Sequence, residues 1–277
     1  MPSPRFVHLR FHSEYSITDG IVRIDPMIHA VLEGGGAAVG ISDLMNVFGG
    51  LRFYTHALAA GLKPILGCDL KVINPKDLNK PFRLGVLCMN HEGYHSLSVL
   101  LTKAFLTNND AARGLVDPKW FDDGGSEGLI ALSGAAQGEL GSLLLGKKWA
   151  LAHEAADRFK AQFPGRFYVE LQRAGRPTDE LATARLANFA VEEQLPVVAT
   201  HPIQFLKPED FEAHEVRCSI AEGYTLQDPR RVKRYTPEQY LKSEAEMCEL
   251  FADIPAAIEN TVEIAKRCNL DGVLSKP

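Results

Sequence analysis

The sequence predicts an α/β fold in which a mainly parallel sheet closes into a barrel. Short runs with β-strand composition alternate with helical segments along the first 200 residues, a pattern typical of α/β proteins. Most of the strand-like runs are apolar on both faces, as expected for a parallel sheet that is covered by helices. Polar residues directly follow several of these runs, and the functional groups of barrels sit at the carboxyl ends of strands.

Seven strands are predicted, and seven strands in 277 residues favour a barrel over an open sheet. They cover Val7–Leu9, Ala38–Ser42, Pro64–Val72, Arg83–Cys88, Leu129–Ser133, Phe167–Leu171 and Leu195–Thr200. Helices are expected between them at about Pro26–Glu33, Gly50–Ala60, Tyr94–Phe105, Ala150–Gln162 and Thr178–Glu193.

After Thr200 the pattern becomes helical. Thr236-Pro237-Glu238-Gln239 carries the signals of a helix start, and Ser243-Glu244-Ala245-Glu246 is a second capping box. Ile254, Ile258 and Val262 mark one face of a final helix that ends near Asn269. We therefore expect one barrel domain over residues 1–270, with residues 271–277 as the start of a linker.

Composition places the chain among soluble globular proteins, with 45% hydrophobic and 23% charged residues. A net charge of −5 excludes a global basic field that would recruit nucleic acid. The sequence has neither a signal-peptide pattern nor a run of membrane-spanning length. Its five scattered cysteines form no C-x-x-C pair, which predicts free thiols and a cytoplasmic location.

The stretch from Phe6 to Gly20 is the most informative part of the sequence. On a regular strand His8, Arg10 and His12 would point to one face, and Asp19 follows after a turn-like run. Two imidazoles and a carboxylate at a strand end are suited to a hydrolytic metal site. Arg10 cannot ligate a metal, so the sequence leaves open a working or a disabled site.

Other residues also follow predicted strands. We expect Arg10, His12, Asp43, Asp69 and His201 to gather at the C-terminal rim of the barrel.

Two apparent motifs carry no chemistry on inspection. His91-Glu92-Gly93-Tyr94-His95 matches a zinc-protease pattern, but it opens a helix after the N-cap Asn90 and no third ligand is near. Gly141–Lys148 resembles a phosphate-binding loop, yet Lys148 stands where Ser or Thr must hold magnesium, so we expect a helix that ends at Gly146.

Long ordered blocks resemble a known family. FVHLRFHSEYSITDG, ISDLMNVFGGLRFY, GLKPILGCDLKV, LPVVATHPIQF and EMCELFADIPAAIENTVEIAKRCN are similar to the PHP (polymerase and histidinol phosphatase) domains at the N-termini of bacterial replicative DNA polymerase III α subunits. The resemblance runs nearly end to end. It implies a distorted (β/α)7 barrel with a helical C-terminal segment, lying ahead of a polymerase region.

Active PHP domains bind up to three metal ions, zinc or manganese, and hydrolyse phosphoesters. The resemblance implies that His12, Asp19 and Asp69 match their ligands and that His8 and Asp43 match flanking positions, with His201 also counted among the vestigial site positions. The remaining positions depart from the family pattern: Arg10, Leu44, Arg83, Ala135, Pro202 and Gln204. We therefore expect no bound metal and no catalytic residue, with Arg10 and Arg83 neutralising the carboxylates instead. If the domain did retain a metal ion, its ligands would come from His8, His12, Asp19, Asp43 and Asp69.

Two functions follow from the resemblance. The first is a non-catalytic scaffold within a DNA polymerase, which contacts the rest of the α subunit and docks the proofreading exonuclease subunit, while the parent protein contacts DNA. The alternative is a metal-dependent phosphoesterase or 3′–5′ exonuclease. An unrelated barrel hydrolase would require the matching blocks to be coincidental.

Overall fold

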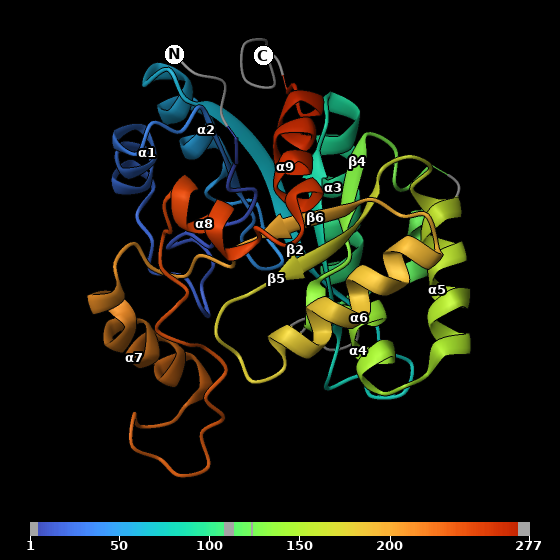
Figure 1. Cartoon of the computed structure of the whole chain (residues 1–277). Coiled ribbons are helices and arrows are strands. Elements are labelled where there is room, and N and C mark those ends of the chain that lie inside the picture. The colour runs from blue at the N-terminus through green and yellow to red at the C-terminus, as the bar shows by residue number, and fades with distance from the viewer. Residues whose placement is uncertain (1–4, 108–113, 123, 271–277) are drawn as a thin grey trace.

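The computed structural model describes residues 5–107, 114–122 and 124–270. Within these residues six strands form one sheet in sequence order, curled into a half-barrel with helices around it (Figure 1). The strands are β1 (Ala38–Ile41), β2 (Lys63–Val72), β3 (Phe82–Cys88), β4 (Leu129–Leu132), β5 (Phe167–Gln172) and β6 (Val197–Thr200). Each overlaps a predicted strand, and the α/β fold class is confirmed.

The first predicted strand, Val7–Leu9, is replaced by a stretch that makes only isolated parallel bridges. His8 bridges to Val39 in β1, and Phe11 bridges to Ile203 just after β6. The N-terminal stretch therefore lies between the two edges of the sheet and joins them.

A β-bulge explains why this stretch is not a regular strand. The Gly40 N–H donates to the His8 carbonyl (2.7 Å), and the Gly40 carbonyl accepts from the Phe11 N–H (3.1 Å). In a regular parallel ladder the two residues that bond to one residue of the neighbouring strand are two positions apart, whereas His8 and Phe11 are three positions apart. One extra residue is thus inserted opposite Gly40, which bends the stretch and changes the direction of its side chains.

The sheet is mixed, which corrects the expectation of a mainly parallel barrel. Strand β3 pairs antiparallel with both β2 and β4, whereas β1–β2, β4–β5 and β5–β6 are parallel. The reason is the connection between β2 and β3, residues 73–81, which is too short for the crossover that a parallel pair requires.

Where helix positions were predicted, the helices agree with them to within a few residues, and Phe211–Glu222 is a further helix for which no bounds were predicted. They are α1 (Ile24–Glu33), α2 (Gly50–Ala59), α3 (His91–Leu106), α4 (Glu139–Leu145), α5 (Trp149–Gln162), α6 (Asp179–Glu192), α7 (Phe211–Glu222), α8 (Glu244–Leu250) and α9 (Pro255–Arg267). Asn90 caps α3 through its side chain, Gly146 ends α4, and the capping box of α8 is formed by Ser243 and Glu246.

The predicted helix start at Thr236 is wrong. Gln239 does reach back to the Thr236 N–H through its side chain, but only a single turn forms. The chain extends directly afterwards, because Tyr240 makes a bridge to Phe205. The linker expected at 271–277 lies outside the described residues.

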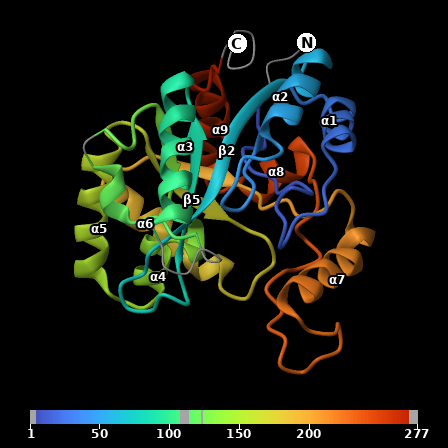
Figure 2. The same ribbon diagram turned by 180° about the vertical axis from the view of Figure 1, so that it is seen from behind.

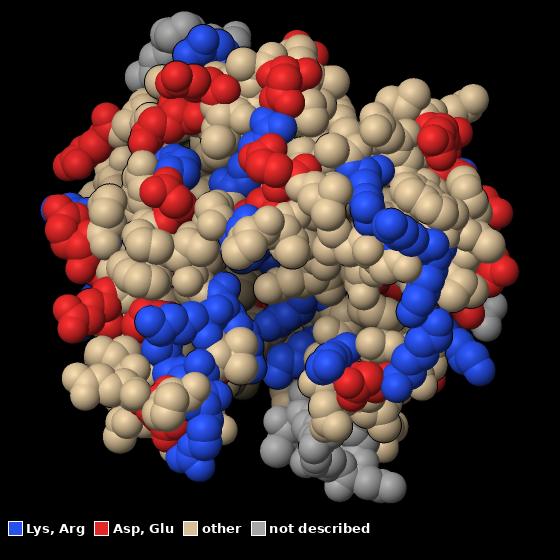
Figure 3. Space-filling model, turned by 60° about the horizontal axis from the view of Figure 1, so that its bottom comes forward, with Lys and Arg blue, Asp and Glu red and all other residues tan. Residues whose placement is uncertain are grey.

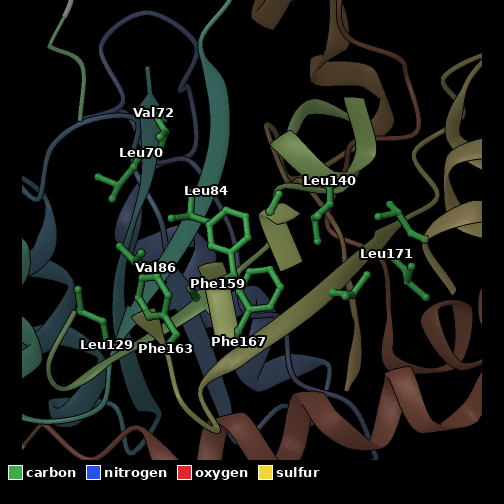
Figure 4. Close-up of a cluster of buried hydrophobic side chains, with 14 of the residues drawn as sticks. Leu70, Val72, Leu84, Val86, Leu129, Leu140, Phe159, Phe163, Phe167 and Leu171 are labelled. Carbon is green, nitrogen blue, oxygen red and sulfur yellow. The ribbon is translucent and has the colours of Figure 1, made fainter. Parts of the chain in front are cut away.

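Three hydrophobic clusters hold the sheet. One lies between the outer face of β2–β6 and α3–α6, and it includes stacked Phe159 and Phe167 rings with centroids 4.6 Å apart (Figure 4). A second packs α1 and α2 against β1 and the N-terminal stretch. The third fills the inside of the half-barrel, where Leu9, Ile65 and Ile130 meet Ile264 of α9.

Helix α9 lies at one end of the half-barrel, and α7 projects at the other (Figures 1 and 2). Among the described residues, no helix combines the length and apolarity needed to cross a bilayer.

Candidate functional site

The inside of the half-barrel changes from apolar to polar along its strands. Side chains on a strand alternate between faces, so Ile65 and Asp69 of β2 share the inner face, as do Tyr168 and Glu170 of β5. The apolar members lie toward α9, and the acidic members lie at the opposite end. Two carboxylates are thus buried inside the barrel, where they need positive partners.

Arg10 provides that partner for both carboxylates. Its Nη2 lies 2.8 Å from Oδ2 of Asp69, and its Nη1 donates to Oε1 of Glu170 at 2.7 Å. The three side chains are 7%, 5% and 0% exposed. Although burial opposes its charge, the attraction of Asp69 and Glu170 raises the pKa of Arg10 above its usual value.

The bulge directs Arg10 to the inside. Leu9 and Arg10 both face the half-barrel, although neighbours on a regular strand would face opposite sides. Gly40 allows this geometry, because a Cβ at that position would lie 2.4 Å from the Leu9 carbonyl oxygen.

His12 and Asp19 extend the network. His12 Nδ1 lies 3.0 Å from Oδ2 of Asp19, and its Nε2 lies 3.4 Å from Oδ2 of Asp69. Burial alone would lower the pKa of His12, but the two carboxylates outweigh burial and raise it to about 9. His12 is therefore an imidazolium at neutral pH, with a carboxylate near each ring nitrogen. Its charge, against the cost of burial, holds the pKa of Asp19 below its usual value.

The antiparallel hairpin explains how Arg83 reaches the same site. Arg83 pairs in register with Lys71, two residues after Asp69, and its Nη1 lies 3.5 Å from Oδ2 of Asp69. Had β3 been parallel, the start of this strand would lie at the other end of the barrel. Despite burial, Arg10 and Arg83 lower the pKa of Asp69 well below its usual value.

Glu170 is the functional residue that sequence reasoning missed. It accepts hydrogen bonds from Arg10, the Gly134 N–H (2.9 Å), Gln172 (3.1 Å) and the Thr200 hydroxyl. The signal was present, because Tyr168, Glu170 and Gln172 alternate along a strand that is otherwise apolar and fully buried. A carboxylate on such a strand requires a buried cation.

Asp43 lies at the same end of the barrel as Asp69 but outside the arginine network. Its carboxylate accepts from the Ser13 N–H (2.6 Å) and the Ser13 hydroxyl (2.7 Å). Burial raises the pKa of Asp43 to about 6, although the Ser13 hydrogen bonds favour the charged form.

His8 and His201 point away from the network, which corrects the expectation that both join it. The His8 ring contacts the Lys242 carbonyl (2.7 Å), and the His201 ring contacts the Glu238 carbonyl (2.9 Å). The bulge turns His8 outward relative to Arg10. The imidazole rings of His8 and His201 lie beside each other, with centroids 6.4 Å apart. Burial lowers the pKa of His8 to about 4 and that of His201 to about 3.

A cavity of about 810 Å³ opens over the network. Figure 3 shows Lys and Arg side chains gathered around the hollow on this face. The predicted positions that line it are Arg10, His12, Asp19, Leu44, Asp69, Arg83, Pro202 and Gln204, whereas His8, Asp43, Ala135 and His201 do not. Lys71, Arg176 and Arg234 add further cations to the wall.

The acidic and imidazole side chains of the network already contact one another and Arg10. Within the described residues, no three His, Cys, Asp or Glu side chains form a group that could hold one ion. The carboxylates of Asp69 and Glu170 point at the Arg10 guanidinium, and both nitrogens of His12 face carboxylates. A divalent ion about 4 Å from a guanidinium is repelled by roughly 8 kcal/mol at an effective dielectric constant near 20.

Comparison with known proteins gives a family match. The model of the PHP domain family matches residues 8–174, which is more than half of the chain.

Individual relatives agree along nearly the whole chain. It is 46% identical over 272 residues to the DNA polymerase III subunit alpha of Pseudomonas fluorescens, covering 98% of this chain and 23% of that protein. It is 43% identical over 270 residues to the DNA polymerase III subunit alpha of Escherichia coli K12, again covering 98% and 23%. The chain thus spans about a quarter of the length of these relatives.

Among solved structures, one similar fold is an amidohydrolase from Chromobacterium violaceum with bound sulfate and no metal. Its TM-score is 0.47 at 12% identity, covering 72% of this chain and 87% of that one.

Proposed function

The chain belongs to the PHP domain family, and on that premise we propose that it is the PHP domain of a DNA polymerase III α subunit whose metal site has been replaced by an ion-pair network. In this proposal the domain does not catalyse hydrolysis. It is a structural scaffold of the polymerase and a docking site for the proofreading exonuclease subunit.

The observation that carries the proposal is the place of Arg10. Its guanidinium contacts Asp69 and Glu170 inside the half-barrel, and Arg83 adds a second positive charge beside Asp69. Buried carboxylates need cations, and two arginines meet that need without metal. The network also ties β2 to β5 and to the N-terminal stretch, which is a structural role in its own right.

The alternative of a metal-dependent phosphoesterase would need Arg10 to leave the network. The Arg10 side chain is buried and bonded on both sides, so its departure would leave buried Glu170 without its bonded cation and remove one of the cations beside Asp69. The geometry therefore favours the scaffold over the enzyme.

Elemental analysis tests the first part of the proposal. Protein purified without chelator should carry far less than one equivalent of zinc or manganese and should not hydrolyse a generic phosphodiester. Stoichiometric metal together with hydrolysis in proportion to it would favour the phosphoesterase.

Support for exonuclease docking comes from the similarity to α subunits and from one exposed strip. Phe48, Leu51 and Leu58, on α2 and the turn before it, are 66%, 56% and 51% exposed. Large exposed apolar residues that lie close together mark protein contacts. Calorimetry with the exonuclease subunit should show saturable binding, weakened by the pair Phe48→Ser and Leu51→Ser.

The matched control is Leu181→Ser on α6, where a leucine is similarly exposed, at 50% against 56% for Leu51. Absence of both heat and co-migration at tens of micromolar, roughly −6 kcal/mol or weaker, would argue against docking.

A further inference from the structure

An apolar groove of about 690 Å³ lies on the other side of the molecule from the polar cavity. Its walls come from the N-terminal stretch, the start of β1 and helices α8 and α9, and they include Val7, Ala38, Phe251, Ile258 and Val262. No residue that lines this groove also lines the polar cavity.

The charges at the rim of the groove do not call for a charged ligand. Arg5 pairs with Glu244 (3.0 Å), Lys266 pairs with Glu263 (2.7 Å), and Lys63 donates to the Asn269 side chain (2.8 Å). Since these cations already have partners, what the groove offers is apolar surface. Surface of this kind, rimmed by polar groups, is suited to a protein segment.

The path of the chain indicates which segment. Asn269 is held by Lys63, which also forms part of the groove wall, and its N–H donates to the Met89 carbonyl (2.7 Å). The next carbonyl, of Leu270, accepts from the Tyr54 hydroxyl (2.7 Å). The described chain therefore ends at residues that are fixed beside the groove, directly after α9 (Figure 1).

The relatives continue far beyond this domain, because the chain matches only 23% of each. We infer that the groove between α8, α9 and the N-terminal stretch is covered by the part of the polymerase subunit that follows residue 277 in the same polypeptide. The inference rests on the proposed function, that the chain is one domain of a longer α subunit. A tethered segment has a high local concentration at a site next to its point of attachment, so modest apolar contacts suffice.

Thiol labelling of the full-length α subunit tests this inference. Ala37 and Ala252 are exposed residues of the groove wall, and Ala213 is an exposed residue of α7 at the other end of the molecule. Each is changed to cysteine in a background with Cys248→Ser, since Cys248 lines the groove whereas the other four cysteines are buried. Maleimide labelling is followed peptide by peptide in native protein and in urea.

In the α subunit alone, Ala37→Cys and Ala252→Cys should label at least ten-fold more slowly than Ala213→Cys, with equal rates in urea. A benzophenone attached at 252 should cross-link to peptides beyond residue 277. Native rates equal to that of Ala213→Cys, or cross-links confined to residues 5–270, would overturn the inference.

Two other occupants are distinguished by the same assay. Protection that appears only after the exonuclease subunit is added assigns the groove to that partner, and protection that grows with protein concentration assigns it to a second copy. Either result overturns the inference. Metal content and exonuclease binding do not depend on the groove, so failure here leaves the proposed function standing.

Discussion

Replacing Arg10 with alanine should destabilise the domain strongly without creating hydrolytic activity. Among the described residues, Arg10 is the cation that hydrogen-bonds to Glu170, and its side chain is 7% exposed. Removal leaves Glu170 with neutral donors alone, from Gly134, Gln172 and Thr200. The carboxylate then bears the cost of burial without a cation that hydrogen-bonds to it.

The structure sets the size of the effect. Breaking a buried ion pair by removal of one partner costs about 3–5 kcal/mol, because an uncompensated charge remains. Asp69 should add little to this cost, because after the loss of Arg10 its carboxylate still has Arg83 at 3.5 Å and His12 at 3.4 Å. We therefore expect a loss of about 3–5 kcal/mol in the free energy of unfolding.

Urea unfolding followed by tryptophan fluorescence and circular dichroism measures this loss. Arg230→Ala is the matched control, because Arg230 is 75% exposed and pairs with Asp228 at the surface; it should cause no measurable change. Arg10→Met combined with Glu170→Gln removes both charges and should lose less than the sum of the single changes. The reasoning is refuted if Arg10→Ala is as stable as Arg230→Ala.

Three further predictions concern the same region. The pKa of His12 is about 9 in the fold and 6.5 ordinarily, so the charged ring stabilises the fold fully below pH 6.5 and this stabilisation is lost as pH rises through 9. The free energy of unfolding should therefore fall by up to about 3 kcal/mol between pH 6.5 and pH 9. The variant His12→Gln should not show this pH dependence. Gly40→Ala should lower the free energy of unfolding in urea by about 1–3 kcal/mol, because the new Cβ clashes with Leu9. Gly50→Ala is the control: Gly50 lies in helix α2 and a Cβ there would be 3.7 Å from its nearest atom, so this change should be neutral or stabilising. Metal binding should be recovered when five positions are restored to the family pattern: Arg10→His, Leu44→His, Arg83→His, Pro202→Asp and Gln204→His. The control carries the other four substitutions but keeps Arg10, and it should not bind metal. Elemental analysis and zinc titration measure both variants.

The fold was predictable because its signals are local. Short apolar runs between helical segments marked every strand of the sheet, and side-chain caps marked the starts of α3 and α8. Thr236 shows the limit of such signals: the capping residues form their turn, but pairing of Tyr240 with Phe205 prevents a helix. A long-range bridge outweighed a local propensity there.

The site was predictable only in part. Motif positions located Arg10, His12, Asp19, Asp69 and Arg83, which the structure brings together. His8 and His201 were misplaced, because face assignment assumed a regular strand and the bulge opposite Gly40 shifts the alternation. Glu170 was missed because no family motif contains it, although its alternation with Tyr168 and Gln172 placed it on the inner face.

By itself, the sequence determined the alternation of strands and helices, the family, and the presence of arginine where metal ligands are expected, since all three are written in residue type and spacing. Only the tertiary structure decided which carboxylates Arg10 neutralises. Asp69 and Glu170 are about a hundred residues apart, and they meet at one guanidinium because β2 and β5 face each other across a curled sheet. It also decided the direction of β3, because a short connection leaves no room for a crossover, and that direction brings Arg83 to the same carboxylate.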